Sequence, residues 1–158
     1  ILYVNLEMYM NNINSFESVD FYQLDELYSD EQKLVRDSVR QFVNQEIIPN
    51  IEDWYEKNNF PLEIVKKMGE TGIFGPNVSP DYGGGGLDSI SYGLIMQELE
   101  RGDSGMRSTA SVQSSLVMYP IEAYGSEEQK KDPLPIAKKY YKWVNSGTIR
   151  KDLTDKKD

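Results

Sequence analysis

One arginine, Arg107, is the only charged residue in the stretch GMRSTASVQSSLVMYP. If this stretch is helical, Arg107, Ser111 and Ser114 lie at positions i, i+4 and i+7 and share one stripe of the helix. Ser108 lies beside that stripe. A planar guanidinium can donate two parallel hydrogen bonds to a carboxylate, and hydroxyl groups can complete the shell around it. The stripe therefore suits the binding of a carboxylate group.

A second interpretation gives Arg107 a purely structural role. Glu100 and Asp103 precede it by about one or two turns and could neutralise its charge as an ion pair that packs the helix. An unpaired buried charge is too costly to keep, so Arg107 needs either such a partner or a negative ligand. Ion pairs are often merely structural, and the residues alone leave both interpretations open.

The composition excludes several classes of function. The 158 residues include no histidine and no cysteine, which excludes His-based triads, His-bound zinc and disulfides within the chain. A formal net charge of -9 disfavours binding to nucleic acids and anionic lipids, because those contacts rely on clustered Lys and Arg. No apolar run approaches the roughly 20 residues that span a bilayer, and the acidic, Asn-rich start is unlike a signal or transit peptide. We expect a soluble protein of the bacterial cytoplasm, without nucleic-acid, membrane or metal partners.

Cap residues and hydrophobic spacing predict a series of helices. The motifs SDEQ and SEEQ are typical of capping boxes, in which a serine and a glutamine satisfy each other's backbone amides. Pro and Gly mark the other boundaries. The expected helices run over residues 29–49, 61–72, 88–99, 104–125 with a kink or end at Pro120, and from 126 onward.

The sequence predicts an all-α fold, because no stretch alternates apolar and polar residues as a strand would. We expect four to six helices in an orthogonal or up-and-down bundle over residues 24–139. The helix over 104–119 is expected to be central and most buried, since its residues are small or apolar on every face. Residues 1–23 are expected to form an irregular N-terminal arm, and residues 140–158 a polar, frayed tail.

The four glycines at 83–86 are typical of a turn between helices. No Gly-Lys-Ser/Thr follows them and no apolar strand precedes them, so a phosphate-binding loop is not expected. The acidic residues are spread over helix starts and polar faces, so a metal site is not expected either.

Residues from about 21 to 131 resemble the N-terminal helical domain of the flavin-dependent acyl-CoA dehydrogenases. The stretches DYGGGG and ELERGDSGMRSTASVQSSLVMYPIEAYGSEEQK carry the resemblance and are closest to the glutaryl-CoA dehydrogenase branch. In that branch the enzyme oxidises glutaryl-CoA between its α and β carbons and then releases CO2, which gives crotonyl-CoA. The resemblance implies that Arg107 and Ser111 contact the distal carboxylate, and that Ser108 and Glu100 belong to the acyl pocket.

The resemblance also implies what lies outside this sequence. In the family, a β-barrel-like middle domain and a C-terminal four-helix domain bind most of the FAD and supply the glutamate that abstracts the α-proton. We therefore expect no catalytic residue in this chain, we assign it no FAD-binding residues, and we expect a truncated chain that is inactive alone. The parent enzyme is expected to be a homotetramer that passes electrons to an electron-transfer flavoprotein. The alternative is a free-standing helical binding or remnant module without catalysis.

Overall fold

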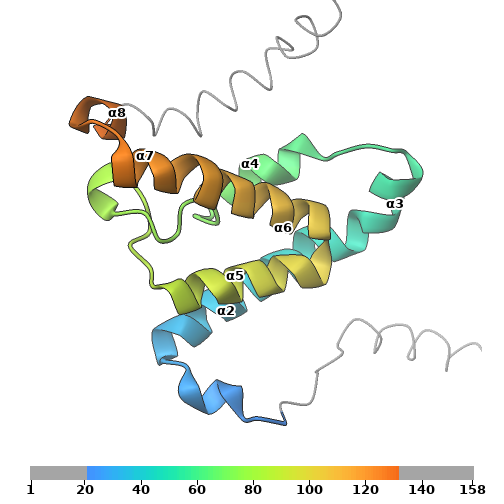
Figure 1. Cartoon of the computed structure of the whole chain (residues 1–158). Helices are drawn as coiled ribbons and strands as arrows, with labels where there is room; N and C mark the ends of the chain where they lie inside the picture. The colour runs from blue at the N-terminus through green and yellow to red at the C-terminus, as the bar shows by residue number, and fades with distance from the viewer. Residues whose placement is uncertain (1–20, 132–158) are drawn as a thin grey trace, which may run out of the picture. The chain divides into compact units, whose positions relative to one another are not determined.

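The computed structural model describes residues 21–131 (Figure 1). The chain divides into two units, Ile1–Asp30 and Glu31–Asp158, which are described separately. In the first unit the described residues contain one short 3-10 helix, η1 (Leu24–Leu27). All regular elements over residues 21–131 are helical, which confirms the predicted all-α class. Most of the expected arm (1–23), the end of the expected domain and the whole of the expected tail (140–158) lie outside the described residues.

The second unit consists of α-helices joined by short 3-10 and π-helical segments. In chain order these elements are α2 (Asp30–Phe42, which begins at the last residue of the first unit), η2 (Val43–Ile47), η3 (Ile48–Asn50), α3 (Ile51–Glu56), α4 (Leu62–Glu70), η4 (Pro80–Tyr82), α5 (Ser89–Gly102), α6 (Ser104–Ser111), η5 (Val112–Met118), α7 (Tyr119–Tyr124) and α8 (Glu127–Lys131). The expected first helix is present as α2, η2 and η3, whereas the sequence did not predict α3.

Side-chain caps fix the starts of α5 and α8. The Asp88 carboxylate accepts a hydrogen bond from the Ser91 amide at 2.7 Å, and this cap begins α5. The predicted capping box at SEEQ is confirmed, because the Ser126 amide donates to Gln129 at 2.8 Å and the Gln129 amide donates to Ser126 at 3.2 Å. Each cap satisfies backbone amides that a helix start leaves without partners.

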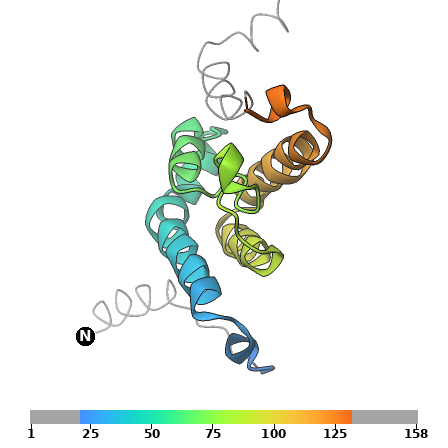
Figure 2. The same ribbon diagram turned by 90° about the vertical axis from the view of Figure 1, so that its left-hand side faces the viewer.

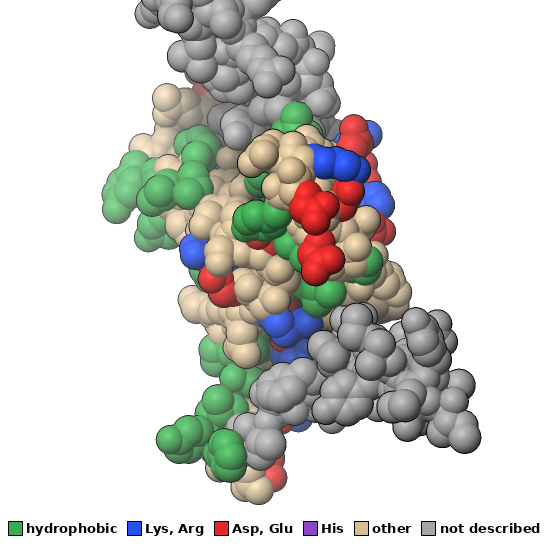
Figure 3. All heavy atoms as spheres, turned by 90° about the vertical axis from the view of Figure 1, so that its right-hand side faces the viewer, with side chains coloured by type: hydrophobic (Ala, Val, Ile, Leu, Met, Phe, Trp, Pro, Cys, Tyr) green, Lys and Arg blue, Asp and Glu red, His purple; other side chains and the backbone are tan. Residues whose placement is uncertain are grey.

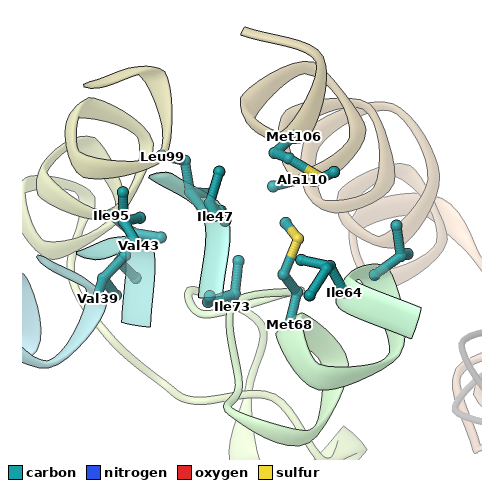
Figure 4. Close-up of a cluster of buried hydrophobic side chains, with 11 residues drawn as sticks. Val39, Val43, Ile47, Ile64, Met68, Ile73, Ile95, Leu99, Met106 and Ala110 are labelled. Carbon is teal, nitrogen blue, oxygen red and sulfur yellow. The ribbon is translucent and has the colours of Figure 1, made fainter. Parts of the chain in front are cut away.

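The hydrophobic core lies where α2 and η2, α4, α5 and α6 meet. Figure 4 shows side chains from all of these elements converging, with Met106 and Ala110 of α6 facing Met68 of α4. Burial of each large apolar side chain contributes about 1.5–3 kcal/mol relative to exposure. The buried residues of this core cluster are Val39, Val43, Ile47, Ile64, Val65, Met68, Ile73, Ile95, Leu99, Met106 and Ala110.

α6, η5 and α7 run on as one continuous helical rod, which Figures 1 and 2 show from two directions. The rod does not end at Pro120, which occupies the first turn of α7. The prediction that this helix is the most buried is wrong. Only one stripe of it packs on the core, and its opposite side exposes Val112, Leu116 and Tyr119 by 49%, 69% and 51%. Instead α5 buries more of its length, at Ser91, Leu94, Ile95, Glu98 and Leu99.

The glycine-rich loop before α5 folds tightly on itself. The Gly86 amide donates to the Val78 carbonyl at 2.8 Å, and the Leu87 amide donates to the Pro76 carbonyl at 2.8 Å. A Cβ atom at Gly84 would lie 2.1 Å from the Val78 carbonyl oxygen, so only glycine allows this approach. The Gly83, Gly84 and Gly85 amides also donate to carbonyls of the same loop. These amides are already bonded within the loop, and the loop does not offer them to a phosphate.

Two hydrogen bonds fasten this loop to the helical rod. The Gly75 amide donates to the Ser114 hydroxyl of η5 at 3.0 Å, and the Ser79 amide donates to a carboxylate oxygen of Glu122 on α7 at 2.8 Å.

Among the described residues, no helix is long and apolar enough to cross a membrane, and no group of acidic side chains is arranged to hold a metal ion.

Candidate functional site

The candidate site lies where α5 ends and α6 begins. Asp103 joins the two helices in an extended conformation, with φ -163° and ψ 127°, and its carboxylate accepts a hydrogen bond from the Met106 amide at 2.8 Å. Gly102 lets the end of α5 approach η2, since a Cβ atom there would lie 2.6 Å from a methyl group of Val43. The change of direction brings Glu100 and Arg107 together, although they lie seven residues apart.

Arg107 is bound by Glu100 through only one of its nitrogen atoms. Its Nε donates to Oε2 of Glu100 at 2.6 Å. The other carboxylate oxygen, Oε1, accepts a hydrogen bond from the Ser104 hydroxyl at 2.8 Å. The guanidinium makes no further hydrogen bond to any residue between 21 and 131, so its two Nη groups keep four unused N–H donors.

The Glu100 carboxylate is held in its ionised form. The hydrogen bond from Arg107, supported by the one from Ser104, lowers the pKa of Glu100 below its ordinary value. Both side chains of the ion pair remain partly exposed, at 36% for Arg107 and 48% for Glu100. Exposed ion pairs contribute little to stability. This pair is therefore of interest for the positions in which it holds the two side chains, and not for its contribution to the free energy of unfolding.

Ser108 and Ser111 lie half-buried on α6, near Arg107 in sequence. The Ser111 hydroxyl donates to the Ser108 carbonyl at 3.1 Å. Ser114, the third member of the predicted stripe, does not belong to this group. It follows the start of the π-helical segment η5, is buried, and accepts the hydrogen bond that anchors the glycine-rich loop.

Glu98 forms a second acid–arginine cluster that the sequence did not predict. Its side chain is buried, with Oε1 accepting from Arg40 of α2 at 2.8 Å and Oε2 accepting from Arg101 at 2.9 Å. Arg101 also donates to the side chain of Asn44 at 2.8 Å. This cluster joins α5 to α2 and η2. A recognisable signal was present, because Glu98 occupies an apolar position in the helical pattern of the buried α5 residues.

Gln113, the second residue of η5, has a buried side-chain nitrogen. Within residues 21–131 its Nε2 atom is enclosed and makes no hydrogen bond. Buried polar groups are nearly always bonded, so an unsatisfied donor is a departure that needs a reason. The sequence analysis did not single out this residue.

The surface near the candidate site carries both signs of charge. Figure 3 views the side of the molecule where, in Figure 1, α3 and the first turns of α6 lie, and it shows acidic side chains beside basic ones at several places. Apolar side chains are exposed between them. The described residues on this side therefore do not form the continuous basic surface that nucleic acids require.

Comparison with known proteins assigns this arrangement to a family. Residues 29–138 match the family model of the acyl-CoA dehydrogenase N-terminal domain. The chain is 40% identical over 110 residues to the probable acyl-CoA dehydrogenase YngJ of Bacillus subtilis, and 36% identical over 110 residues to the glutaryl-CoA dehydrogenase of Desulfococcus multivorans. Each alignment covers 68% of this chain and 28% of the relative.

A solved structure extends the likeness to the fold. The glutaryl-CoA dehydrogenase of Mycobacterium smegmatis, crystallised in complex with FADH2, superposes with a TM-score of 0.70 at 42% sequence identity. The match covers 75% of this chain and 30% of that structure. The chain thus spans less than a third of the length of these relatives. On the family match and on these similarities, the chain belongs to the acyl-CoA dehydrogenases and corresponds to their N-terminal domain.

Proposed function

We propose that this domain supplies the acyl and carboxylate pocket of a glutaryl-CoA dehydrogenase. The reaction would be the FAD-dependent oxidation of glutaryl-CoA between its α and β carbons, followed by decarboxylation to crotonyl-CoA. The observation that supports this substrate most directly is the half-bound guanidinium of Arg107, whose two Nη groups bind no residue between 21 and 131 while Nε is held by Glu100. A monocarboxylic acyl chain would give these donors nothing to bind.

The free edge of Arg107 is suited to the distal carboxylate of the substrate. With Nε occupied, the two Nη groups can still bind a carboxylate end-on through two parallel hydrogen bonds. Lysine could supply the charge but not this geometry. Ser108 and Ser111 lie within one turn of Arg107 on α6, and we assign their hydroxyls to the same pocket. Glu100 is assigned the role of holding Arg107 in place.

The cofactor and the catalytic base belong to the whole enzyme in this proposal. FAD supplies the hydride acceptor when it is bound. The glycine-rich loop does not fit a phosphate, because its own carbonyls accept the hydrogen bonds of its amides. We therefore assign this chain's described residues to substrate binding and none of them to FAD. We propose further that the whole enzyme is a cytoplasmic homotetramer. It would pass its electrons to an electron-transfer flavoprotein.

The proposal can be tested in a full-length enzyme that carries this domain. Residues 21–131 would replace the corresponding segment of the Mycobacterium smegmatis glutaryl-CoA dehydrogenase, and kcat/KM would be measured with glutaryl-CoA and butyryl-CoA. We expect Arg107→Lys, and more so Arg107→Met, to reduce kcat/KM for glutaryl-CoA. Loss of a charge-assisted pair in a desolvated pocket costs about 2–5 kcal/mol, which corresponds to roughly 30-fold or more.

Butyryl-CoA is the internal control, because it has no distal carboxylate. Its kcat/KM should change far less in either variant. If both substrates lose activity equally, Arg107 stabilises the junction of α5 and α6 instead of binding the substrate, and the interpretation as a packing ion pair is correct.

A further inference from the structure

Asp103, which joins α5 to α6, is held from outside these two helices by Tyr55 of α3. The Tyr55 hydroxyl donates to Oδ2 of Asp103 at 2.9 Å, while Oδ1 accepts the hydrogen bond from the Met106 amide that caps α6. Figure 1 shows α3 at the end of the fold where α6 begins. Among residues 21–131, no other side chain from outside α5 and α6 makes a hydrogen bond to residues 103–111.

α3 has an anchor of its own and does not depend on this bond. Trp54 lies next to Tyr55 in sequence, is partly buried and packs against the hydrophobic core. Tyr55 is 68% exposed, and one hydrogen bond at an exposed position contributes little to the free energy of unfolding. The bond also raises the pKa of Tyr55 above its ordinary value, so the hydroxyl remains a donor at neutral pH. The effect of the bond is therefore expected at Asp103 and not at α3.

The conformation of Asp103 decides how Glu100 and Arg107 meet. Glu100 belongs to α5 and Arg107 to α6, and Asp103 is the single residue between the two helices. Because the backbone turns only about φ and ψ, rotation at Asp103 moves α6 relative to α5. Met106 and Ala110 hold α6 on the core through apolar contacts, which are non-directional, whereas a hydrogen bond has a preferred angle. A hydrogen bond that fixes Asp103 therefore fixes the contact between the acid and the guanidinium.

We infer that Tyr55 is a positioning residue that, by fixing Asp103, holds Arg107 against Glu100 in the orientation that receives an acidic ligand. The inference rests on the proposed function for the identity of that ligand. Tyr55 itself need not touch the ligand. Its role is to keep the junction of α5 and α6 in one conformation, so that Nε of Arg107 stays on Glu100 and the Nη groups keep a constant direction.

The inference can be tested by NMR on the complete 158-residue chain. Hydrogen exchange of the Nε–H group of Arg107, which donates to Glu100, would be compared in the wild type and Tyr55→Phe, with Arg107→Lys used to assign the signal. Tyr55→Phe keeps the ring and removes only the hydroxyl. We expect exchange of this group to become about threefold faster, the effect of losing one weak hydrogen bond. The midpoint of urea denaturation should hardly change.

Tyr82→Phe is the matched control, because it removes the same kind of bond at another place. The Tyr82 hydroxyl donates to a carboxylate oxygen of Glu127 at 3.1 Å and so joins η4 to α8, which follows the α7 end of the helical rod (Figure 1). This variant should leave the Nε–H exchange of Arg107 unchanged. Equal acceleration in Tyr55→Phe and Tyr82→Phe would overturn the inference, as would unchanged exchange in Tyr55→Phe.

A second substitution tests whether Tyr55 acts through Asp103. Asp103→Ser keeps a side chain that can cap α6 but removes the oxygen that Tyr55 binds. It should speed the Nε–H exchange of Arg107 to a similar extent, and adding Tyr55→Phe to it should have no further effect. Additive effects of the two substitutions would show that Tyr55 does not act through Asp103 and would overturn the inference. The backbone amide spectrum shows whether each variant is folded.

Addition of glutaryl-CoA to the same samples separates the inference from the proposed function. If Arg107 binds the distal carboxylate, its guanidinium signals should shift in the wild type, and the apparent affinity should fall about threefold in Tyr55→Phe. An unchanged affinity would overturn the positioning role. If Tyr55→Phe speeds Nε–H exchange but glutaryl-CoA shifts no Arg107 signal in the wild type, the control of the junction by Tyr55 is supported and the proposed ligand is contradicted.

Discussion

Glu98 and Glu100 lie two residues apart on α5, and each is hydrogen-bonded to arginine, yet they face different surroundings. Glu98 is 1% exposed, and its two oxygens are bound by Arg40 and Arg101. Glu100 lies at the exposed end of the helix and is bound by Ser104 and by one nitrogen of Arg107. Both arginines of the first cluster serve the contact between helices, whereas the guanidinium in the second keeps donors free.

The difference teaches that the same pair of residue types can stabilise a fold or, as we propose for Arg107 and Glu100, prepare a binding site, depending on burial and on which donors are used. A buried carboxylate must have its hydrogen bonds satisfied, because an unsatisfied buried charge is costly. A half-exposed pair contributes little stability and can be arranged for another purpose. Stability and ligand binding should therefore separate when the two acids are changed one at a time.

The largest expected effect is on stability, from Glu98→Gln. This change weakens the hydrogen bonds from two arginines to a buried acceptor, and we expect the free energy of unfolding to fall by about 2 kcal/mol, comparable to one or two hydrogen bonds with a charged group. Urea denaturation followed by circular dichroism measures it. Glu100→Gln is the matched control and should lower the free energy of unfolding much less. Equal losses of stability in the two variants would show that the two acid–arginine clusters contribute equally to the fold.

A second prediction concerns how the contribution of Glu98 to stability depends on pH. Burial alone would raise the pKa of Glu98, but the hydrogen bonds and charges of Arg40 and Arg101 outweigh it and lower the pKa below 4.5. The unfolded chain restores the ordinary value, so ionised Glu98 stabilises the fold above about pH 4.5, and this contribution is lost as the pH falls through the folded-state pKa. Glu98→Gln should therefore be less sensitive to acid than the wild type.

The measurement is the free energy of unfolding of the two proteins between pH 6 and pH 3. The difference between them should be largest near neutral pH and shrink on acidification. A constant difference over this range would mean that the pKa of Glu98 is the same in the folded and the unfolded chain. Asp88, Glu100 and Glu127 also have lowered pKa values and are unchanged in the variant, so part of the acid sensitivity should remain.

Local chemistry made much of the fold predictable from the sequence. Asp88 and the pair Ser126 and Gln129 form the caps that their residue types and spacing indicate, because a cap depends on three or four neighbouring residues. The arginine of the candidate site was also recognisable, as one charge among small and apolar residues. Its contact with Glu100 was one of two open interpretations, and its unused Nη groups could not be read from spacing.

Burial and helix type were less predictable, for physical reasons. The residues of α6 and η5 are mostly small, weakly polar or apolar on every face, so the composition did not reveal that only one stripe packs on the core. The π-helical segments η2 and η5 were not predicted, because an extra residue in a turn has no strong local signature. In η5 this turn separates Ser114 from the stripe of Arg107.

A third polar side chain extends the comparison and gives the smallest predicted effect. Glu98 is buried and satisfied, Glu100 is exposed and satisfied, and the Nε2 atom of Gln113 is buried without a partner among residues 21–131. Removing an unsatisfied buried donor relieves its desolvation penalty, so Gln113→Met should raise the free energy of unfolding by about 1 kcal/mol. Urea denaturation of the 158-residue chain measures this change.

Gln97→Met is the matched control for this last prediction, because Gln97 is exposed on α5 and makes no side-chain hydrogen bond to the described residues. It should leave stability nearly unchanged, as most substitutions at exposed positions do. If Gln113→Met is destabilising while Gln97→Met is neutral, the amide of Gln113 has a partner in solution, and its burial resembles that of Glu98. If Gln113→Met is stabilising, the amide of Gln113 has no hydrogen-bond partner in the folded 158-residue chain, and its burial differs from that of Glu98.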